Sequence, residues 1–114
     1  MAFPGTYNFN YYRGDTFNFT ISPKDSTGTA FLLSGYTATF TIATARGTGA
    51  TQYSGTTTVN TSTNIITCTL PANIGRNLVG GSTYVYDVQI ASGSVIYTLL
   101  TGTISSTDDI TGAV

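Results

Sequence analysis

The few ionisable side chains of this sequence limit the chemistry that it can perform. Neither histidine nor glutamate occurs in it, and the 114 residues include four Lys or Arg and five Asp. Without histidine there is no Ser-His-Asp triad, no Cys-His pair and no histidine-bound metal. Cys68, the only cysteine, lies among β-branched residues with no cation nearby in the sequence, so we expect a buried structural thiol.

Two aspartate motifs could do chemistry in principle. Asp25-Ser26-Thr27-Gly28 is similar to the Asp-Thr-Gly of aspartic proteases, but those enzymes need two carboxylates that share a proton. A turn explains Asp25 better, because an Asp side chain accepts hydrogen bonds from the nearby main chain. Asp108-Asp109 offers too few oxygens for calcium, which takes six to eight, so we expect a solvated tail there. We therefore predict no catalytic residues, no metal and no cofactor.

Three further motifs are explained by local structure. Arg13-Gly14-Asp15 is the triplet that integrins bind, but a glycine between two strands is typical of a turn. Asn18-Phe19-Thr20 and Asn60-Thr61-Ser62 match the glycosylation sequon. No basic and apolar leader precedes them, so we expect synthesis in the cytosol and unused sequons. No run of about 18 apolar residues predicts a membrane span.

Charge and composition exclude other classes of function. Charged residues make up only 8% of the chain, against roughly 25% in ordinary globular proteins, and the net charge is −1. Four scattered cations cannot form the basic face that nucleic acid requires. Low charge also leaves little repulsion between copies, as suits a subunit of an assembly.

Alternation of apolar and polar side chains predicts strands over much of the chain. The alternating segments are residues 7–12, 16–22, 36–43, 83–90 and 95–104. The last two flank Ser-Gly-Ser and form a hairpin that we expect at the centre of the fold.

The remaining segments are less regular. Residues 56–60 and 64–69 are rich in β-branched side chains and predict another hairpin. Residues 44–55 predict an exposed loop with a weak edge strand near Gln52 and Tyr53. The only helical signal is Pro71 to Leu78, of two turns at most.

These elements predict the fold class. Short strands separated by turns, with no alternation of strands and helices, indicate an all-β protein. We expect residues 1–114 to form a single domain, an antiparallel immunoglobulin-like β-sandwich of about seven to eight strands with one short helical turn near Pro71–Leu78. A small barrel is the alternative.

Aromatic residues supply the candidate contact surface. Tyrosines such as Tyr84, Tyr86 and Tyr97 could stack on sugar rings, but core or interface positions explain most of them. Strand edges and uncharged Thr-rich faces suit contacts with other proteins. The candidate protein-contact residues are Tyr7, Phe9, Tyr11, Tyr12, Gln52 and Tyr53.

Several segments in order along the chain carry a resemblance to a known family. They are Tyr12-Arg13-Gly14-Asp15-Thr16-Phe17, Leu33-Ser34-Gly35-Tyr36-Thr37-Ala38, Leu70-Pro71-Ala72, Tyr84-Val85-Tyr86-Asp87-Val88-Gln89-Ile90, Tyr97-Thr98-Leu99-Leu100-Thr101-Gly102-Thr103-Ile104 and Asp109-Ile110-Thr111. As a set, the chain resembles small immunoglobulin-like β-domain structural proteins of tailed bacteriophages, including the N-terminal domain of the upper baseplate proteins of lactococcal phages.

The resemblance implies a virion component without enzymatic activity. The expected partners are other virion proteins, namely the major capsid protein or tail and baseplate proteins, in a homo-oligomer or symmetric assembly. No fibre or receptor-binding region follows Val114, which favours a capsid decoration or cement protein. A tail, neck or baseplate attachment module is the alternative, and a carbohydrate-binding module is the second alternative.

Overall fold

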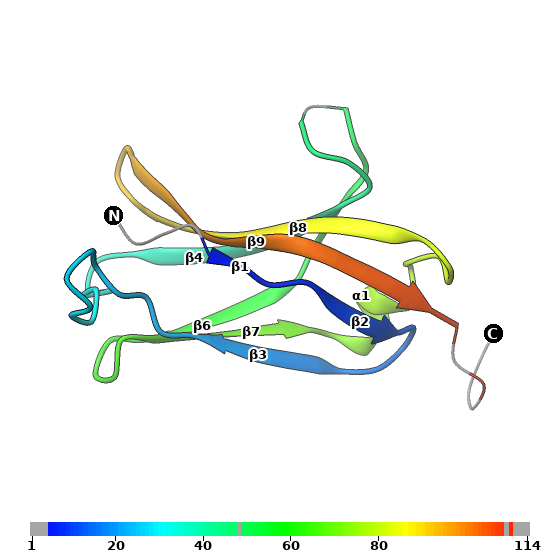
Figure 1. Ribbon diagram of the computed structural model, residues 1–114, viewed down its shortest axis with the longest axis horizontal. Helices are drawn as coiled ribbons and strands as arrows, with labels where there is room; N and C mark the ends of the chain where they lie inside the picture. Colours follow the sequence, from blue (N-terminus) through cyan, green and yellow to red (C-terminus); the bar gives the residue numbers. More distant parts are fainter. Residues whose placement is uncertain (1–4, 48, 109, 111–114) are drawn as a thin grey trace.

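Two β-sheets face each other in the computed structural model, which describes residues 5–47, 49–108 and 110 (Figure 1). In chain order the elements are β1 (Gly5–Thr6), β2 (Phe9–Tyr12), β3 (Phe17–Ile21), β4 (Thr37–Ala43), β5 (Gln52–Ser54), β6 (Thr56–Asn60), β7 (Ile65–Leu70), α1 (Ala72–Gly75), β8 (Thr83–Ser92) and β9 (Val95–Thr107).

The strand order is that of an immunoglobulin-like sandwich. The larger sheet has the order β1-β9-β8-β4-β5, with β2 also paired to β9, and the smaller sheet has the order β3-β7-β6. Immunoglobulin domains of the variable type likewise extend the sheet that contains strands G, F and C. The predicted all-β sandwich is confirmed, with nine strands among the described residues instead of seven or eight, and the β8–β9 hairpin is central to the larger sheet.

One part of the topology differs from the expected antiparallel sandwich. Both β1 and β2 pair with β9 in parallel, at Gly5↔Leu100 and Phe9↔Ile104, while every other strand pair is antiparallel. Two paired strands that a short turn connects must run antiparallel. No such turn connects β1 or β2 to β9, because β1 and β2 lie near the N-terminus and β9 lies near the C-terminus, so these pairs are free to be parallel.

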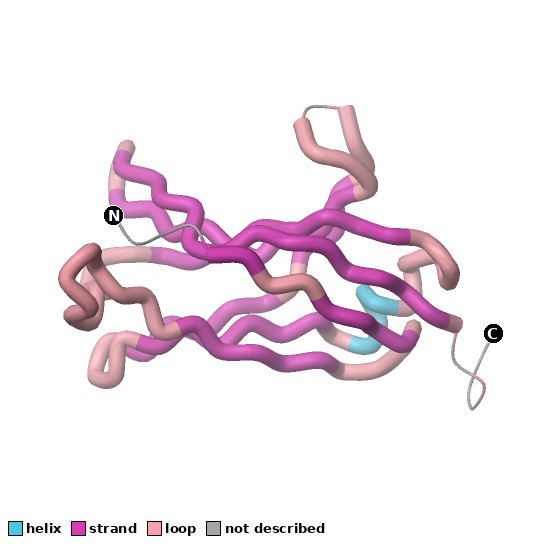
Figure 2. The backbone as a smooth tube through the Cα atoms, viewed as in Figure 1, coloured by secondary structure: helices cyan, strands magenta, loops and turns pink. Residues whose placement is uncertain are grey.

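The predicted elements match the observed ones with small shifts. Of the strand expected over residues 7–12, only Phe9–Tyr12 is a strand, β2; Tyr7 and Asn8 separate it from the short strand β1, which precedes the predicted range (Figure 2). The weak strand near Gln52 is β5. The helix α1 is a single turn that follows Pro71, and hydrogen-bonded turns continue from it to Leu78.

Alternating burial explains how the sheets pack. Along β8, Tyr84, Tyr86, Val88 and Ile90 are buried, whereas the residues between them are partly exposed. Burial alternates in a similar way along β4, in the same sheet, and along β7, in the facing sheet. The reason is that successive side chains of a strand point to opposite faces of its sheet. The inner faces of the two sheets thus form one continuous core.

Three aromatic rings tie the sheets together at the centre of the core. Phe19 of β3 lies 5.4 Å from Phe40 of β4 and 6.1 Å from Tyr86 of β8, between ring centroids, and Phe40 and Tyr86 lie 5.7 Å apart. Antibody domains place an inter-sheet disulfide and a tryptophan at this part of the fold. Here edge-to-face aromatic packing joins the same three strands without a disulfide.

Candidate functional site

The predicted contact residues divide between core and surface. Phe9 and Tyr11 are only 8% and 2% exposed, so their side chains belong to the core and not to a contact surface of this fold. Tyr53 is half-buried and its ring packs against Tyr84. The exposed members of the set are Tyr7, Tyr12 and Gln52.

These exposed residues do not form one patch. Tyr7 and Tyr12 belong to the edge of the larger sheet made by β1 and β2, whereas Gln52 lies on β5 at its opposite edge. Residues 44–51 form the predicted loop before β5, of which Thr48 lies outside the described residues. The edge strand predicted near Gln52 and Tyr53 is thus present as β5, and the whole width of the larger sheet separates it from the other proposed contact segment.

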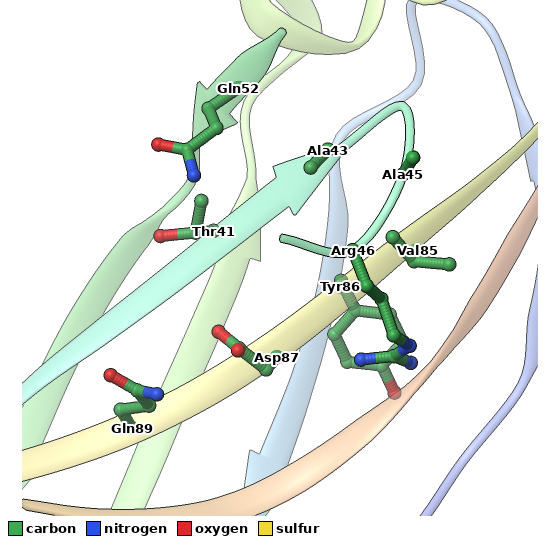
Figure 3. A pocket seen from close by; sticks show the side chains of 9 residues that line it. All are labelled: Thr41, Ala43, Ala45, Arg46, Gln52, Val85, Tyr86, Asp87 and Gln89. Carbon is green, nitrogen blue, oxygen red and sulfur yellow. The ribbon is translucent and has the colours of Figure 1, made fainter. Parts of the chain in front are cut away.

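A polar hollow lies on the outer face of the larger sheet, beside that loop. Figure 3 shows the residues that line it: Thr41, Ala43, Ala45, Arg46, Gln52, Val85, Tyr86, Asp87 and Gln89. Arg46 reaches from the loop over β8, and its Nη2 donates a hydrogen bond of 3.4 Å to the carbonyl of Gly102. Carboxylate, amide and hydroxyl groups from three strands thus share one shallow site.

The electrostatics of the hollow centre on Asp87. Burial against the sheet raises the pKa of its carboxyl above the ordinary value, and the nearby Arg46 guanidinium partly opposes that shift. Asp87 is the one acidic residue among the side chains that line this hollow. The arrangement can hold a small polar ligand by hydrogen bonds, but it pairs no nucleophile with a base.

A second surface, which the sequence did not predict, lies at one end of the sandwich. The loop before β4 and the turn between β8 and β9 both lie at this end, with the turn standing apart from the loop (Figure 1). The rings of Phe31 and Tyr36 pack together, with centroids 5.6 Å apart, and Tyr97 lies 6.0 Å from Phe31. Next to these rings in the sequence are three exposed apolar side chains. Ile96 precedes Tyr97 on β9 and therefore points to the outer face of the larger sheet, whereas Tyr97 faces Phe31. We call the six residues at this end of the sandwich the apolar end: Phe31, Leu32, Tyr36, Val95, Ile96 and Tyr97.

Exposure is the distinctive feature of the apolar end. Leu32, Val95 and Ile96 are 70%, 44% and 59% exposed, and none of the six residues is charged. The sequence signal was present in Phe31-Leu32-Leu33, of which only Leu33 is fully buried. It could not be interpreted without the fold, because Tyr97 approaches Phe31 only when β9 has paired with β8.

The Arg-Gly-Asp triplet has a structural role. The guanidinium of Arg13 donates hydrogen bonds to the carbonyls of Arg76 and Leu78 and forms an ion pair of 3.3 Å with Asp108. Gly14 has a positive φ of 85° in the turn that leads to β3, as expected for a turn glycine. Arg13 thereby fastens the segment after α1 to the β2–β3 turn.

Asp25 and Cys68 also have the structural roles expected from the sequence. Asp25 accepts hydrogen bonds from the N–H groups of Thr27 and Thr29 and from the Thr27 hydroxyl, which lowers its pKa and confirms the turn. Cys68 is fully buried, and burial raises the pKa of its thiol to about 12. Asp109 lies outside the described residues.

The described residues form neither a metal site nor a membrane-spanning helix. Across residues 5–47, 49–108 and 110, no three Cys or Asp side chains cluster closely enough to hold a metal ion. In the same part of the chain, no helix is long and apolar enough to cross a membrane. No protein-family model matches the sequence. No curated protein matches it significantly.

Proposed function

We propose that this chain is a non-enzymatic structural protein of a bacteriophage virion that binds other virion proteins in many copies, as a capsid decoration or cement protein. The observation that carries the proposal is the apolar end. Several exposed, uncharged apolar side chains at one end of a small sandwich, on both faces of β9, favour contact with another protein there. The position in a virion rests on the resemblance of the sequence to phage β-domain proteins.

The rest of the surface is suited to dense packing. The outward-facing positions of β4 and β9 are mainly threonines, such as Thr39 and Thr103, and the net charge is only −1. Hydroxyl-rich faces can be covered by a neighbour without the large cost of removing charges from water. Such a surface stabilises an assembly by contact and needs no bound cofactor.

Attachment at the tail, neck or baseplate is the alternative location and would use the same surface. A carbohydrate-binding role is less well supported by the structure. Stacking on sugars needs exposed aromatic faces, but Tyr11, Tyr84 and Tyr86 are buried, and among the described tyrosines Tyr7 and Tyr12 alone are exposed.

Cryo-electron microscopy of the particles tests the proposal. We expect density for the sandwich at regular positions on the shell, with the apolar end against a neighbouring protein. Density confined to the tail would support the alternative location, and absence from the particle would overturn the proposal.

A pair of variants tests the surface itself. Ile96→Asp places a charge on the apolar end, whereas Val79→Asp changes an equally exposed apolar residue that follows α1, toward the other end of the sandwich. We expect only Ile96→Asp to lower the amount of protein incorporated into particles. Equal incorporation of both variants would exclude the apolar end as the contact surface.

A further inference from the structure

The smaller sheet has two edge strands, β3 and β6, and in the described part of the chain each of them pairs with β7 alone. Alternate residues of β3 therefore direct their N–H and C=O groups away from the sheet. Free edges are usually protected by a charged side chain, a proline or a bulge. The β3 sequence, Phe17-Asn18-Phe19-Thr20-Ile21, contains neither charge nor proline, and its register with β7 is continuous.

An apolar hollow adjoins this edge. Tyr7 and Leu100 of the larger sheet face Phe19 and Ile21 of β3 across a space of about 430 Å³. A second hollow of about 360 Å³ shares Ile21, Ser22 and Leu100 with it and so continues the opening beyond the end of β3, where Pro23 and Lys24 also line it. The apolar side chains of β3 point toward the interior but remain half-exposed along this opening.

The opposite side of the sandwich is closed by the chain itself. Gly55 joins β5 of the larger sheet directly to β6 of the smaller one, and its N–H donates to the carbonyl of Phe40. The Thr57 hydroxyl donates to the carbonyl of Ala38 nearby, across the two sheets. In the described part of the chain, the side beside β3 therefore combines an unpaired strand edge with the two apolar hollows.

We infer that β3 pairs antiparallel with β3 of a second copy of this chain, about a two-fold axis at Phe19. A two-fold interface requires a surface that complements itself. The alternation along β3 is a palindrome, since pairing about Phe19 sets Phe17 opposite Ile21 and Asn18 opposite Thr20 of the other copy. Apolar side chains then meet apolar ones in the hollow, and polar ones meet on the outer face.

The pairing is weak in solution and stronger in an assembly. Five residues on each side make an interface at the small end of specific complexes, below about 1,200 Å² in total. Neighbouring subunits fixed in a shell experience a high effective concentration, which offsets weak affinity. The inference thus rests on and deepens the proposed function, because it names the edge through which copies meet.

Sedimentation of the purified chain over micromolar to millimolar concentration tests the pairing independently of any virion. We expect a concentration-dependent dimer. The double substitution Asn18→Lys with Thr20→Lys places like charges directly opposite each other at both outer pairs, and should weaken the dimer at least about tenfold. Asn18→Lys with Thr20→Asp makes the same two pairs opposite in charge, and should restore the dimer most strongly at low salt.

The matched control is Thr56→Lys with Thr58→Lys, which adds the same charge to exposed positions on β6, the other edge of the smaller sheet. It should leave the dimer unchanged, and circular dichroism should show all variants folded. A chain that stays monomeric at millimolar concentration would overturn the inference. So would a dimer that the lysine pair on β3 and the lysine pair on β6 weaken equally, or one that Asn18→Lys with Thr20→Asp fails to restore. Capture of an unrelated extended strand by a monomeric chain would reassign the edge to a different partner. None of these results bears on whether the chain is found in virions, which the microscopy decides.

Discussion

The hydroxyl oxygen of Tyr84 accepts a hydrogen bond of 2.7 Å from the main-chain N–H of Val79. Tyr84 lies near the start of β8, two residues before Tyr86 of the central aromatic trio. In immunoglobulin domains a tyrosine at this position of the corresponding strand bonds to the upstream main chain in the same way. The bond fixes the segment that follows α1 against the larger sheet.

Removal of this hydroxyl should destabilise the domain. Tyr84→Phe keeps the buried ring but leaves the Val79 N–H without its acceptor, at a cost of about 1–3 kcal/mol in the free energy of unfolding. Urea unfolding followed by circular dichroism measures the loss. Tyr12→Phe, at an exposed tyrosine, is the control and should be neutral. Equal stability of Tyr84→Phe and the unaltered chain would exclude a role for the bond.

The parallel contact of the first strands with β9 depends on Gly102. A Cβ atom at this position would lie 2.0 Å from the carbonyl oxygen of Tyr7, a main-chain atom that cannot move without displacing the strand. Tyr7 is also held by Thr101, whose carbonyl accepts its N–H. Gly102→Ala should therefore cost about 1–3 kcal/mol of unfolding free energy through overpacking.

The control for Gly102 lies on the same interface. A Cβ atom on Gly5 would meet Leu100 Cδ1 at 3.6 Å, an ordinary van der Waals distance. Gly5→Ala should leave the urea midpoint nearly unchanged while Gly102→Ala lowers it. Similar midpoints for the two variants would mean that β1 is not held closely against β9.

The strands were predictable because their pattern is local. Residues 36–43 and 83–90 alternate strictly, and the structure places β4 and β8 there with the predicted faces inward. A turn glycine such as Gly14 is equally local, since φ depends on the residue itself. Fold class followed from counting such segments.

Pairing across the chain was not predictable in this way. The parallel direction of β2 on β9 and the contact of Phe31 with Tyr97 both join segments more than sixty residues apart. Phe9 and Tyr11 also alternate as a half-exposed edge strand would, yet they are buried because β3 lies beneath them, with Phe9 stacked 4.4 Å from Phe17. Sequence periodicity gives the inward face of a strand but not how much of that face another sheet covers.

Cys68 should be chemically inert in the folded protein. Its side chain is fully buried, and a thiol with a pKa of about 12 contains almost no thiolate at neutral pH. We expect no reaction with a disulfide reagent such as Ellman's reagent under native conditions, and one equivalent of reaction in denaturant. Rapid modification of the folded chain would show that β7 opens readily.

Asp87 should make stability depend on pH. Burial raises its pKa in the folded state, so the folded chain binds this proton more tightly than the unfolded chain. Ionisation of Asp87 therefore lowers stability as the pH rises from the unfolded pKa through the folded one. Asp87→Asn removes the buried charge while keeping a polar side chain beside Arg46. We expect its melting temperature to exceed that of the unaltered chain at neutral pH.

The advantage of Asp87→Asn should disappear at about pH 3, where the carboxyl is protonated in both states. Asp25 supplies a control of opposite sign, because hydrogen bonds from Thr27 lower its pKa in the folded state. Its contribution to stability is present above the unfolded pKa and is lost as the pH falls through the folded one. Asp25→Asn should therefore lower the melting temperature at neutral pH and have less effect in acid. If Asp87→Asn raised the melting temperature equally at neutral pH and at pH 3, the charge of Asp87 would not be the cause of the increase. The hollow on the larger sheet would then have to be more hydrated than the burial of Asp87 implies.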